Sequence, residues 1–521
     1  MVDQERFFQE GIFDVWVDSK RESDVKELRQ KLLTKSKYLN AIQCPKYLWI
    51  RCNEPQRIPD PSESLQYVFN IGKEVGQLAK QRFPGGADIP EDGFIENIEK
   101  TKELLGRKER CPIYEAGIMA DRFYARADIL VPVEGDSWDI VEVKCSTSVK
   151  EINYDDVAFQ SYVYKKAGLK INRCCLMHIN NQYVRQGDID IGELFTIEDI
   201  TDEVSEAENQ VESVVEGLLK IIDREECPSC GISEMCSNPY DCPLIPECWA
   251  HIPDGSVFEF NRMKKKKRFE LYDGGKVLMK DAADKDLNPK QMIQKRCSQE
   301  GDSYVDESLI SGFLNGLKYP LCYLDFETVM SPVPRFDGVR PYQQIPFQFS
   351  VHVQEYPGAD LKHKMFLVKS SNDPRSEIIE NLKEALGEDG SIAVYYATFE
   401  KTRLKELGRD FPETQEWVDS VLSRIVDLHD PFAKFWFYHP SQKGKTSIKK
   451  VLPVVTGKSY EGMEIADGAT AFREYARVTY SEVSEEERQR VYDALEKYCA
   501  LDTEGMVELV KSLEKLSKTK Q

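Results

Sequence analysis

The sequence lacks any apolar run approaching the ~18 residues that a membrane-spanning helix needs. Its first residues, MVDQERFFQEGIFDVW, carry acids early and lack the basic and then apolar order of a signal peptide. Internal repeats and extended low-complexity tracts are also missing. We therefore expect a cytoplasmic protein with no membrane partner, in a compartment that keeps thiols reduced.

Positive charges are outnumbered, with 70 Lys and Arg residues against 90 Asp and Glu residues. The formal net charge of −20 argues against a generally basic coat for nucleic acid. It leaves room for a local basic channel, because binding follows the local field and not the total charge. The one basic run, RMKKKKR at residues 262–268, fits either such a channel or an ordinary solvated surface.

The composition favours globular domains. With 521 residues, the chain has room for about three domains of usual size. Strand-like and helix-like segments alternate in two long stretches, which predicts two mixed-sheet α/β domains. We expect a polar lead-in over residues 1–30, a first α/β domain over 31–251, a mostly helical linker over 252–318, and a second α/β domain over 319–521.

A first group of polar residues lies in FYARADILVPVEGDSWDIVEVKCS, which reads as a β-hairpin around the turn EGDS. In its second strand Glu142 and Lys144 share one face with Ile140, and Asp128 lies on the partner strand. Two carboxylates can bind Mg²⁺ or Mn²⁺, and a lysine can stabilise a phosphate. The pattern predicts a metal-assisted phosphodiester hydrolysis site.

The next helix, DDVAFQSYVYKKAGL, is expected to be amphipathic, with Gln160 and Tyr164 one turn apart. This order resembles the RecB-type branch of the PD-(D/E)XK nucleases, with its Asp strand, Glu-x-Lys strand and Gln-x-x-x-Tyr helix. The resemblance covers Ser36 to about Trp249. It implies catalytic roles for Asp128, Glu142, Lys144, Gln160 and Tyr164, with Asp128 and Glu142 as metal ligands. One departure is that FNIGKEVGQLAKQRFPGG lacks the histidine of many relatives, so Glu74 or a water would have to substitute.

Five of the fourteen cysteines lie in CPSCGISEMCSNPYDCPLIPEC, residues 227–248. In a reducing compartment they favour a metal site over disulfides. A subset of the RecB-like nucleases, including AddB proteins and CRISPR-adaptation exonucleases, closes the domain with a [4Fe–4S] cluster on one early and three late cysteines. The resemblance implies that Cys44 is joined by Cys236, Cys242 and Cys248, or alternatively by Cys227, Cys230 and Cys236. A zinc site that includes His251 is the alternative. The role we infer for either metal is structural.

A second acidic group starts in YPLCYLDFETVM, where Asp325 and Glu327 share one face of a strand. Two carboxylates so placed repel each other unless a cation lies between them. Further on, SIAVYYATFEKTRLKEL sets Glu400 at the start of a helix. A last long helix, opened by a capping box from Ser484 to Glu487, places Tyr498 and Asp502 on one face; its sequence is SEEERQRVYDALEKYCALDTEGMVELVKSL.

This half, from about Tyr319 to Leu516, resembles the tyrosine-bearing variety of the DEDD exonucleases, on an RNase H-like fold. The resemblance implies that Asp325, Glu327 and Asp502 bind two Mg²⁺ or Mn²⁺ ions and that Tyr498 orients the attacking water. Glu400 stands where that family usually has aspartate. Asp427 and the basic segment QKGKTSIKK are expected either to support substrate phosphates or to serve the fold alone.

The two groups together predict a two-headed, metal-dependent nuclease that acts on single strands or ends, with DNA favoured over RNA as its partner. Its setting would be DNA repair, end processing or defence. Two alternatives remain: a nucleic-acid-binding protein whose N-terminal site has decayed, and a non-catalytic scaffold organised by the iron–sulfur cluster.

Overall fold

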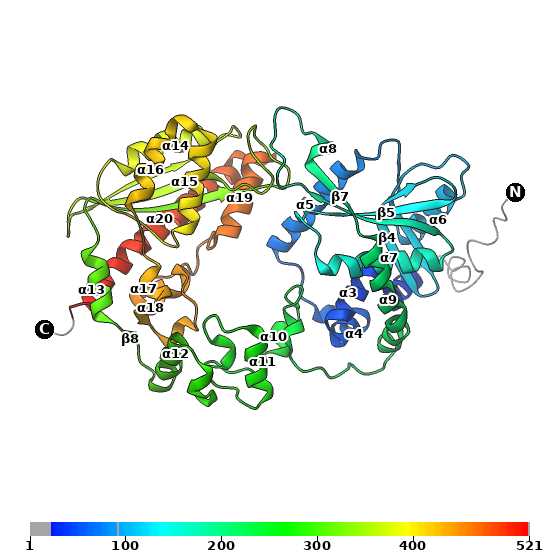
Figure 1. The fold of residues 1–521 in the computed structure, drawn as a ribbon, viewed down its shortest axis with the longest axis horizontal. Coiled ribbons are helices and arrows are strands. Elements are labelled where there is room, and N and C mark those ends of the chain that lie inside the picture. Colours follow the sequence, from blue (N-terminus) through cyan, green and yellow to red (C-terminus); the bar gives the residue numbers. More distant parts are fainter. Residues whose placement is uncertain (1–21, 91–92, 519–521) are drawn as a thin grey trace. The chain divides into compact units, whose positions relative to one another are not determined.

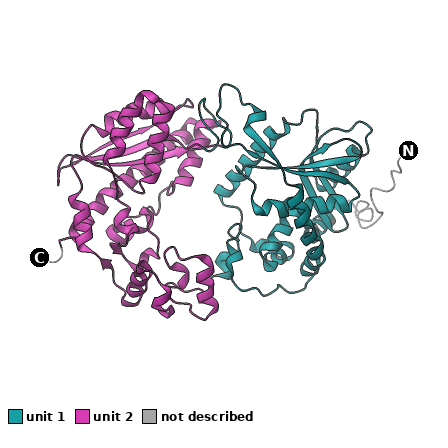
Figure 2. Cartoon of the chain, in the orientation of Figure 1, with its two compact units in different colours: residues 1–251, 332–342 teal, residues 252–331, 343–521 magenta. Residues whose placement is uncertain are grey.

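The computed structural model describes residues 22–90 and 93–518. The chain forms two compact units, coloured separately in Figure 2: Met1–His251 with Pro332–Tyr342, and Ile252–Ser331 with Gln343–Gln521. Of the expected lead-in over residues 1–30, the first 21 residues lie outside the described part, and α2 (Glu22–Lys31) follows. None of the described helices combines the length and apolar character needed to cross a membrane.

Unit 1 is built on a seven-stranded mixed sheet in the order β2-β3-β4-β5-β6-β7, with β1 paired to β4 (Figure 1). The β3–β4, β4–β5 and β6–β7 pairs are antiparallel, and the β5–β6 pair is parallel. The expected hairpin is therefore present as β4 and β5. The strands are β1 (Leu33–Thr34), β2 (Ala87–Asp88), β3 (Ile113–Ala120), β4 (Phe123–Pro132), β5 (Ser137–Lys144), β6 (Lys170–Ile179) and β7 (Phe195–Asp199).

Helices bury both faces of this sheet. One face packs on α7 and α9 in a core that includes Ile140 and Leu176, and the other packs on α5 through Val75 and Ala79. The helices are α3 (Lys35–Gln43), α4 (Pro45–Asn53), α5 (Glu63–Lys80), α6 (Phe94–Leu105), α7 (Glu151–Lys166), α8 (Ile191–Leu194), α9 (Thr201–Ile222) and α10 (Ile245–Cys248).

Helix α7 differs from the amphipathic helix predicted for it. Its buried residues point in several directions around the helix, because it packs against strands β3, β4 and β6, against α9 and against α3. Its polar residues Asp156 and Gln160 are therefore buried with its apolar ones. Buried polar groups require hydrogen-bond partners, which is how this helix comes to contribute to a polar site.

Unit 2 contains a five-stranded mixed sheet in the order β11-β10-β9-β12-β13. Strand β9 is central, antiparallel to β10 and parallel to β12. Its side chains alternate as expected: Cys322, Leu324 and Phe326 enter the core on one face, and Tyr323 enters the core on the other. The strands are β9 (Leu321–Val329), β10 (Ile345–Gln354), β11 (Leu361–Leu367), β12 (Ile392–Val394) and β13 (Ile425–Asp427).

The long C-terminal helix α20 packs against β9 and β10 on the Tyr323 face, while α14, α15 and α16 supply the core of the opposite face. Ser484 caps α20 by accepting from the Glu487 amide, but the Glu487 carboxylate pairs with Arg477, so the predicted capping box is only half formed. These helices are α14 (Arg375–Leu386), α15 (Thr398–Asp410), α16 (Gln415–Arg424), α17 (Asp430–Ala433), α18 (Ile448–Thr456), α19 (Gly468–Tyr480) and α20 (Glu485–Leu516).

The stretch expected as a linker, residues 252–318, folds as part of unit 2. It holds α11 (Lys265–Asp273), α12 (Pro289–Glu300) and α13 (Glu307–Asn315), and β8 (Tyr304–Val305) pairs with β14 (Phe437–Tyr438). The chain is thus an α/β protein with two mixed sheets and a long C-terminal helix, as the alternation of segments predicted.

Candidate functional sites

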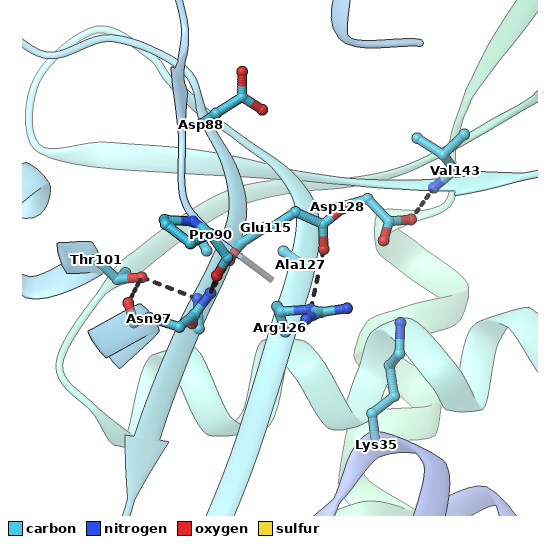
Figure 3. A network of polar contacts seen from close by, with 12 residues as sticks. Lys35, Asp88, Pro90, Asn97, Thr101, Glu115, Arg126, Ala127, Asp128 and Val143 are labelled. Atoms are coloured by element: carbon cyan, nitrogen blue, oxygen red, sulfur yellow. Dashed lines mark hydrogen bonds and ion pairs between the residues drawn. The ribbon is translucent and has the colours of Figure 1, made fainter. Parts of the chain in front are cut away.

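The hairpin of unit 1 brings the first two predicted carboxylates together. In its register Ile129 pairs with Val141, so Asp128 and Glu142 each lie one residue beyond that pair. The Val143 amide donates to Asp128 Oδ2 at 2.7 Å, which holds this carboxylate against the edge of β5 (Figure 3).

Two lysines neutralise Glu142. Lys144 Nζ lies 2.6 Å from Glu142 Oε1 and 2.7 Å from Asp156 Oδ2. Lys35 Nζ lies 2.8 Å from the same Glu142 oxygen and 3.4 Å from Asp156 Oδ1. Gln160 donates to Glu142 Oε2 at 2.8 Å and to Asp156 Oδ1 at 3.1 Å. The structure therefore assembles the predicted Glu142, Lys144 and Gln160, together with Lys35 and Asp156, which sequence reasoning missed.

Asp156 and Lys35 differ in how far the sequence could have revealed them. Asp156 lies one helical turn before Gln160 on α7, so the predicted helix could have revealed it. Lys35 is 107 residues away from Glu142 in the chain and directly follows β1, a strand of only two residues. No periodic pattern marks so short a strand.

Tyr164 does not contact the carboxylates. Its hydroxyl donates to the Ala116 carbonyl and accepts from the Ala127 amide at 3.1 Å, so it joins β3 and β4 beside Asp128. Its position indicates a structural role. Glu74, expected as a possible substitute ligand, is exposed on α5.

The charges of the unit 1 site shift the pKa values of Asp128 and Glu142 in opposite directions. Burial and the nearby Glu142 charge raise the pKa of Asp128 to about 7. Burial opposes ionisation of Glu142 too, but the Lys144 and Lys35 ammonium groups hold its pKa well below the ordinary value. Glu142 is thus a stable anion with its compensating cations built into the fold.

In unit 2 three predicted carboxylates converge. Asp325 and Glu327 on β9 and Asp502 on α20 each offer an oxygen, and these three atoms lie within 4.8 Å of one another. This is the only group of three or more histidine, cysteine or acidic side chains with that spacing among the described residues. Glu327 and Asp502 are buried and Asp325 is partly buried.

Glu400 completes the acidic surroundings. It lies in the first turn of α15, as expected, and is 2% exposed. Its Oε2 atom is buried without a hydrogen-bond partner among the described residues. Burial raises the pKa of Glu400 to about 8, and its charge adds to the field that raises the pKa of Asp325.

Mutual repulsion marks the whole group. Burial and the Asp502 charge raise the pKa of Glu327 to about 8, and burial raises the pKa of Asp502 to about 6. Burial and the other carboxylates raise the pKa of Asp325 well above its ordinary value. Buried carboxylates that face one another in this way are stabilised when a cation binds between them.

Two tyrosines and a lysine surround Asp502. Tyr460 donates to Asp502 Oδ1 at 2.5 Å, and the ring centre of the predicted Tyr498 lies 6.0 Å from that of Tyr460. Lys449 Nζ lies 4.9 Å from the centre of the Tyr498 ring and 5.4 Å from that of Tyr460. Lys449 belongs to the predicted basic segment QKGKTSIKK, whereas no sequence signal pointed to Tyr460.

Asp427 serves the fold. Its carboxylate accepts from the backbone amides of Tyr396, Ala397 and His429, and it thereby shapes the loop that leads into α15. The basic run at 262–268 is divided: Lys267 pairs with Asp286 and Arg268 donates to the Phe260 carbonyl, while residues 264–266 are exposed at the start of α11.

Five cysteines line one small cavity in unit 1: Cys44, Cys230, Cys236, Cys242 and Cys248. All fourteen cysteines are free thiols. Lys46 Nζ lies 3.4 Å from Cys248 Sγ, and burial raises the pKa of Cys242 to about 11. The favoured set of Cys44, Cys236, Cys242 and Cys248 thus faces one space, with Cys230 beside it. Cys227 and His251 do not line the cavity.

One family model matches a stretch of the chain that lies mostly in unit 2. Residues 322–447 match the family described as "Domain of unknown function (DUF2779)". This range contains Asp325, Glu327 and Glu400 and ends before Asp502.

Curated relatives match the chain over a longer stretch than the family model does. The chain is 26% identical over 273 residues to the "Uncharacterized protein MG366 homolog" of Mycoplasma pneumoniae, covering 49% of this chain and 39% of that protein. It is 28% identical over 223 residues to "Uncharacterized protein MG366" of Mycoplasma genitalium, covering 39% and 33%. It is 27% identical over 228 residues to "Uncharacterized protein UU173" of Ureaplasma parvum, covering 38% and 32%. The chain therefore spans well under half the length of these relatives.

Proposed function

We propose that this protein is a metal-dependent nuclease whose hydrolytic site is the carboxylate group of unit 2. The observation that carries the proposal is the convergence of Asp325, Glu327 and Asp502 within 4.8 Å. The buried, unpartnered oxygen of Glu400 in the same electrostatic surroundings supports it. Unpaired acids inside a protein are costly, and a bound cation removes that cost.

The donor set fits Mg²⁺ or Mn²⁺, because both ions prefer carboxylate oxygens to other protein ligands. Asp325, Glu327 and Asp502 would hold the metal, and Glu400 offers one further oxygen. When bound, such ions neutralise charge on the phosphate and lower the pKa of water.

The surrounding side chains account for the other parts of the reaction. Tyr498 lies one helical turn before Asp502 on α20, so it is placed to orient the attacking water. Lys449 holds a positive charge over the Tyr498 ring and attracts the phosphate of the substrate. Together with the acids on the central strand of a five-stranded mixed sheet, this supports an RNase H-like, DEDD-type 3′→5′ exonuclease.

The substrate we propose is the end of a single nucleic-acid strand, DNA in preference to RNA. With a net charge of −20, the chain would have to attract this polyanion through local basic groups such as Lys449. DNA repair, end processing and defence are the settings that such an activity serves.

The cysteine cavity supports a second proposal, a structural [4Fe–4S] cluster on Cys44, Cys236, Cys242 and Cys248. A [4Fe–4S] cluster takes four thiolates, and the five cysteines that line the cavity can supply them. His251, which the alternative zinc site would use, is not among the lining residues. Anaerobic purification with an absorption spectrum, an iron assay and a zinc assay distinguishes the two metals.

Glu142 and Asp156 of unit 1 do not fit a divalent ion as they stand. Both Glu142 oxygens and both Asp156 oxygens already face protein donors, from Lys35, Lys144 and Gln160. The RecB-type resemblance predicts a second hydrolytic site here. The donors around Glu142 favour the alternative in which this PD-(D/E)XK-like unit binds nucleic acid and does not cleave it.

The decisive experiment is degradation of end-labelled single strands by the full chain with Mg²⁺ or Mn²⁺, and with a chelator. We expect metal-dependent shortening from the 3′ end. Asp325→Asn should reduce the rate about a thousandfold, since metal binding contributes several kcal/mol to transition-state stabilisation. Asp360→Asn, an exposed acid in the turn after β10, is the matched control. If the wild-type chain leaves every DNA and RNA tested intact, the nuclease proposal is lost and a non-catalytic scaffold takes its place.

A further inference from the structure

Lys35 is fixed in the unit 1 site by backbone structure. Strand β1 pairs with β4 in parallel, Leu33 opposite Phe123 and Thr34 opposite Tyr124. Lys35 follows at once as the first residue of α3, and Thr34 caps that helix by accepting from the Lys37 amide. Figure 3 shows the Lys35 side chain extended toward the Asp128 carboxylate. The backbone position of Lys35 is therefore fixed by the pairing of β1 and by the capped start of α3.

The Lys35 ammonium stands beside the oxygen that a metal would need. It lies 2.8 Å from Glu142 Oε1, the atom that also accepts from Lys144. Lys35 and Lys144 bring two positive charges to the two negative charges of Glu142 and Asp156. A divalent ion at Glu142 would have to displace one of these lysines, which would then repel it.

A cavity with basic walls adjoins this cation. It is lined by side chains that include Lys35, Arg29, Arg51 and Arg126, with Asp128 as its acid. Arg126 pairs with Glu115 at 3.0 Å. Lys37, also in the lining, is already committed to the backbone: its Nζ donates to the carbonyls of residues 29, 30 and 32.

The same wall carries aromatic rings. Phe94 and Tyr124 line the cavity, and their ring centres are 4.9 Å apart. The Arg29 guanidinium lies 5.3 Å from the Phe94 ring centre. Guanidinium groups and an ammonium match phosphate oxygens, and aromatic faces beside them suit nucleotide bases.

We propose that Lys35 takes the place of a divalent ion in unit 1, and that the adjoining cavity binds phosphate groups of a nucleic-acid strand without metal. The identity of the strand rests on the proposed function; the phosphate chemistry rests on the cavity itself. Lys35 and Lys144 are suited to this role because their side chains remain 23% and 27% exposed while holding Glu142.

The first test counts metal ions in the full chain. In Asp325→Asn/Glu327→Gln, which disables the unit 2 site, Mn²⁺ titration followed by electron paramagnetic resonance should find no tightly bound ion. Adding Lys35→Ala should create one Mn²⁺ site per chain, and Glu142→Gln should abolish it again. If the variant with Lys35 intact still binds one Mn²⁺ that Glu142→Gln removes, the proposal is overturned.

The second test measures binding of a labelled single strand in the presence of a chelator, by fluorescence anisotropy, as a function of salt. Lys35→Ala should weaken binding about tenfold and reduce the slope of log K against log salt by about 0.7, the value for one lost phosphate contact to a single strand. Lys108→Ala, an exposed lysine beyond the far end of α6, should change neither. Binding in chelator that is unaffected by Lys35→Ala overturns the proposal.

The two proposals fail separately. If the wild-type chain cleaves nothing but binds strands through Lys35 in chelator, the nuclease function is lost and the phosphate site stands. If cleavage depends on Asp325 while Lys35→Ala leaves metal count and binding unchanged, the nuclease stands and the phosphate site is lost.

Discussion

The two units place acids on central strands in similar ways, yet they balance the charge differently. In unit 1 Glu142 lies beside Lys144 and Lys35, so the fold provides its own cations. In unit 2 Asp325, Glu327 and Asp502 face one another with Lys449 as the nearby cation, and Glu400 adds another negative charge. The comparison teaches that a pair of strand carboxylates does not by itself define a metal site. What decides is whether other elements already supply the positive charge that balances these carboxylates.

The largest expected effect is on stability: replacing one glutamate by glutamine should change the stability of the two units in opposite directions. Glu142→Gln should destabilise unit 1 by about 3 kcal/mol, because it removes the buried anion that Lys144 and Lys35 share and leaves Asp156 alone to balance both lysines. Glu327→Gln should stabilise metal-free unit 2, because it removes repulsion between buried acids. Hydrogen exchange of peptides from β5 and β9, followed by mass spectrometry, reports each unit separately. If both substitutions destabilise their units, or both stabilise them, the comparison is contradicted.

The cysteine cavity gives a second way to compare the units, because it belongs to unit 1 alone. Cys44 lies at the end of α3, the helix that begins at Lys35. Cys242→Ser should remove bound iron and cost unit 1 about 2 kcal/mol, which lowers its melting temperature by about 4–8 °C. Cys227→Ser, outside the cavity, should retain the iron and serves as the control. Iron analysis and calorimetry measure both effects. Loss of iron in Cys227→Ser with retention in Cys242→Ser would reverse the ligand assignment.

The pH dependence of stability should also differ between the units. The pKa of Glu327 rises from 4.5 to about 8 on folding, so its contribution to stability is complete below about 4.5 and is lost as the pH rises through 8. Metal-free unit 2 should therefore become less stable from about pH 5 to pH 8.

In unit 1 the lysines lower the pKa of Glu142, so its contribution is present above the unfolded value of 4.5 and is lost on acidification. Urea unfolding between about pH 2 and pH 8, with and without Mn²⁺, measures both trends. Mn²⁺ should abolish the loss of stability in unit 2 at high pH. A unit 2 whose stability does not respond to Mn²⁺ would contradict the metal assignment.

The smallest expected effect concerns the partner of Asp502. Tyr460→Phe removes a hydrogen bond to that carboxylate and should lower the rate of strand cleavage about tenfold, or about 1.4 kcal/mol. Tyr356→Phe, with an exposed ring in the same unit, should leave the rate unchanged. Initial rates at saturating Mn²⁺ make the comparison, and an unchanged rate in Tyr460→Phe would show that this tyrosine only packs.

Much of the architecture could be predicted because its signals are local. The β4–β5 hairpin, the acids of β9 and the alignment of Tyr498 with Asp502 follow from periods of two and 3.6 residues. The prediction for α7 was wrong about its amphipathic character, because a helix buried on several sides has no polar face for a period to reveal. Tyr164 was placed on the correct helix, but its hydroxyl turned out to join β3 to β4.

By itself, the sequence determined the alternation of strands and helices, the strand faces that carry acids, and the cysteine-rich segment. Only the tertiary structure decided which charges meet. Lys35 reaches Glu142 because a two-residue strand pairs with β4, and Tyr460 reaches Asp502 through packing of distant segments. Such contacts depend on how the elements pack against one another, and this packing produces no periodic pattern in the sequence.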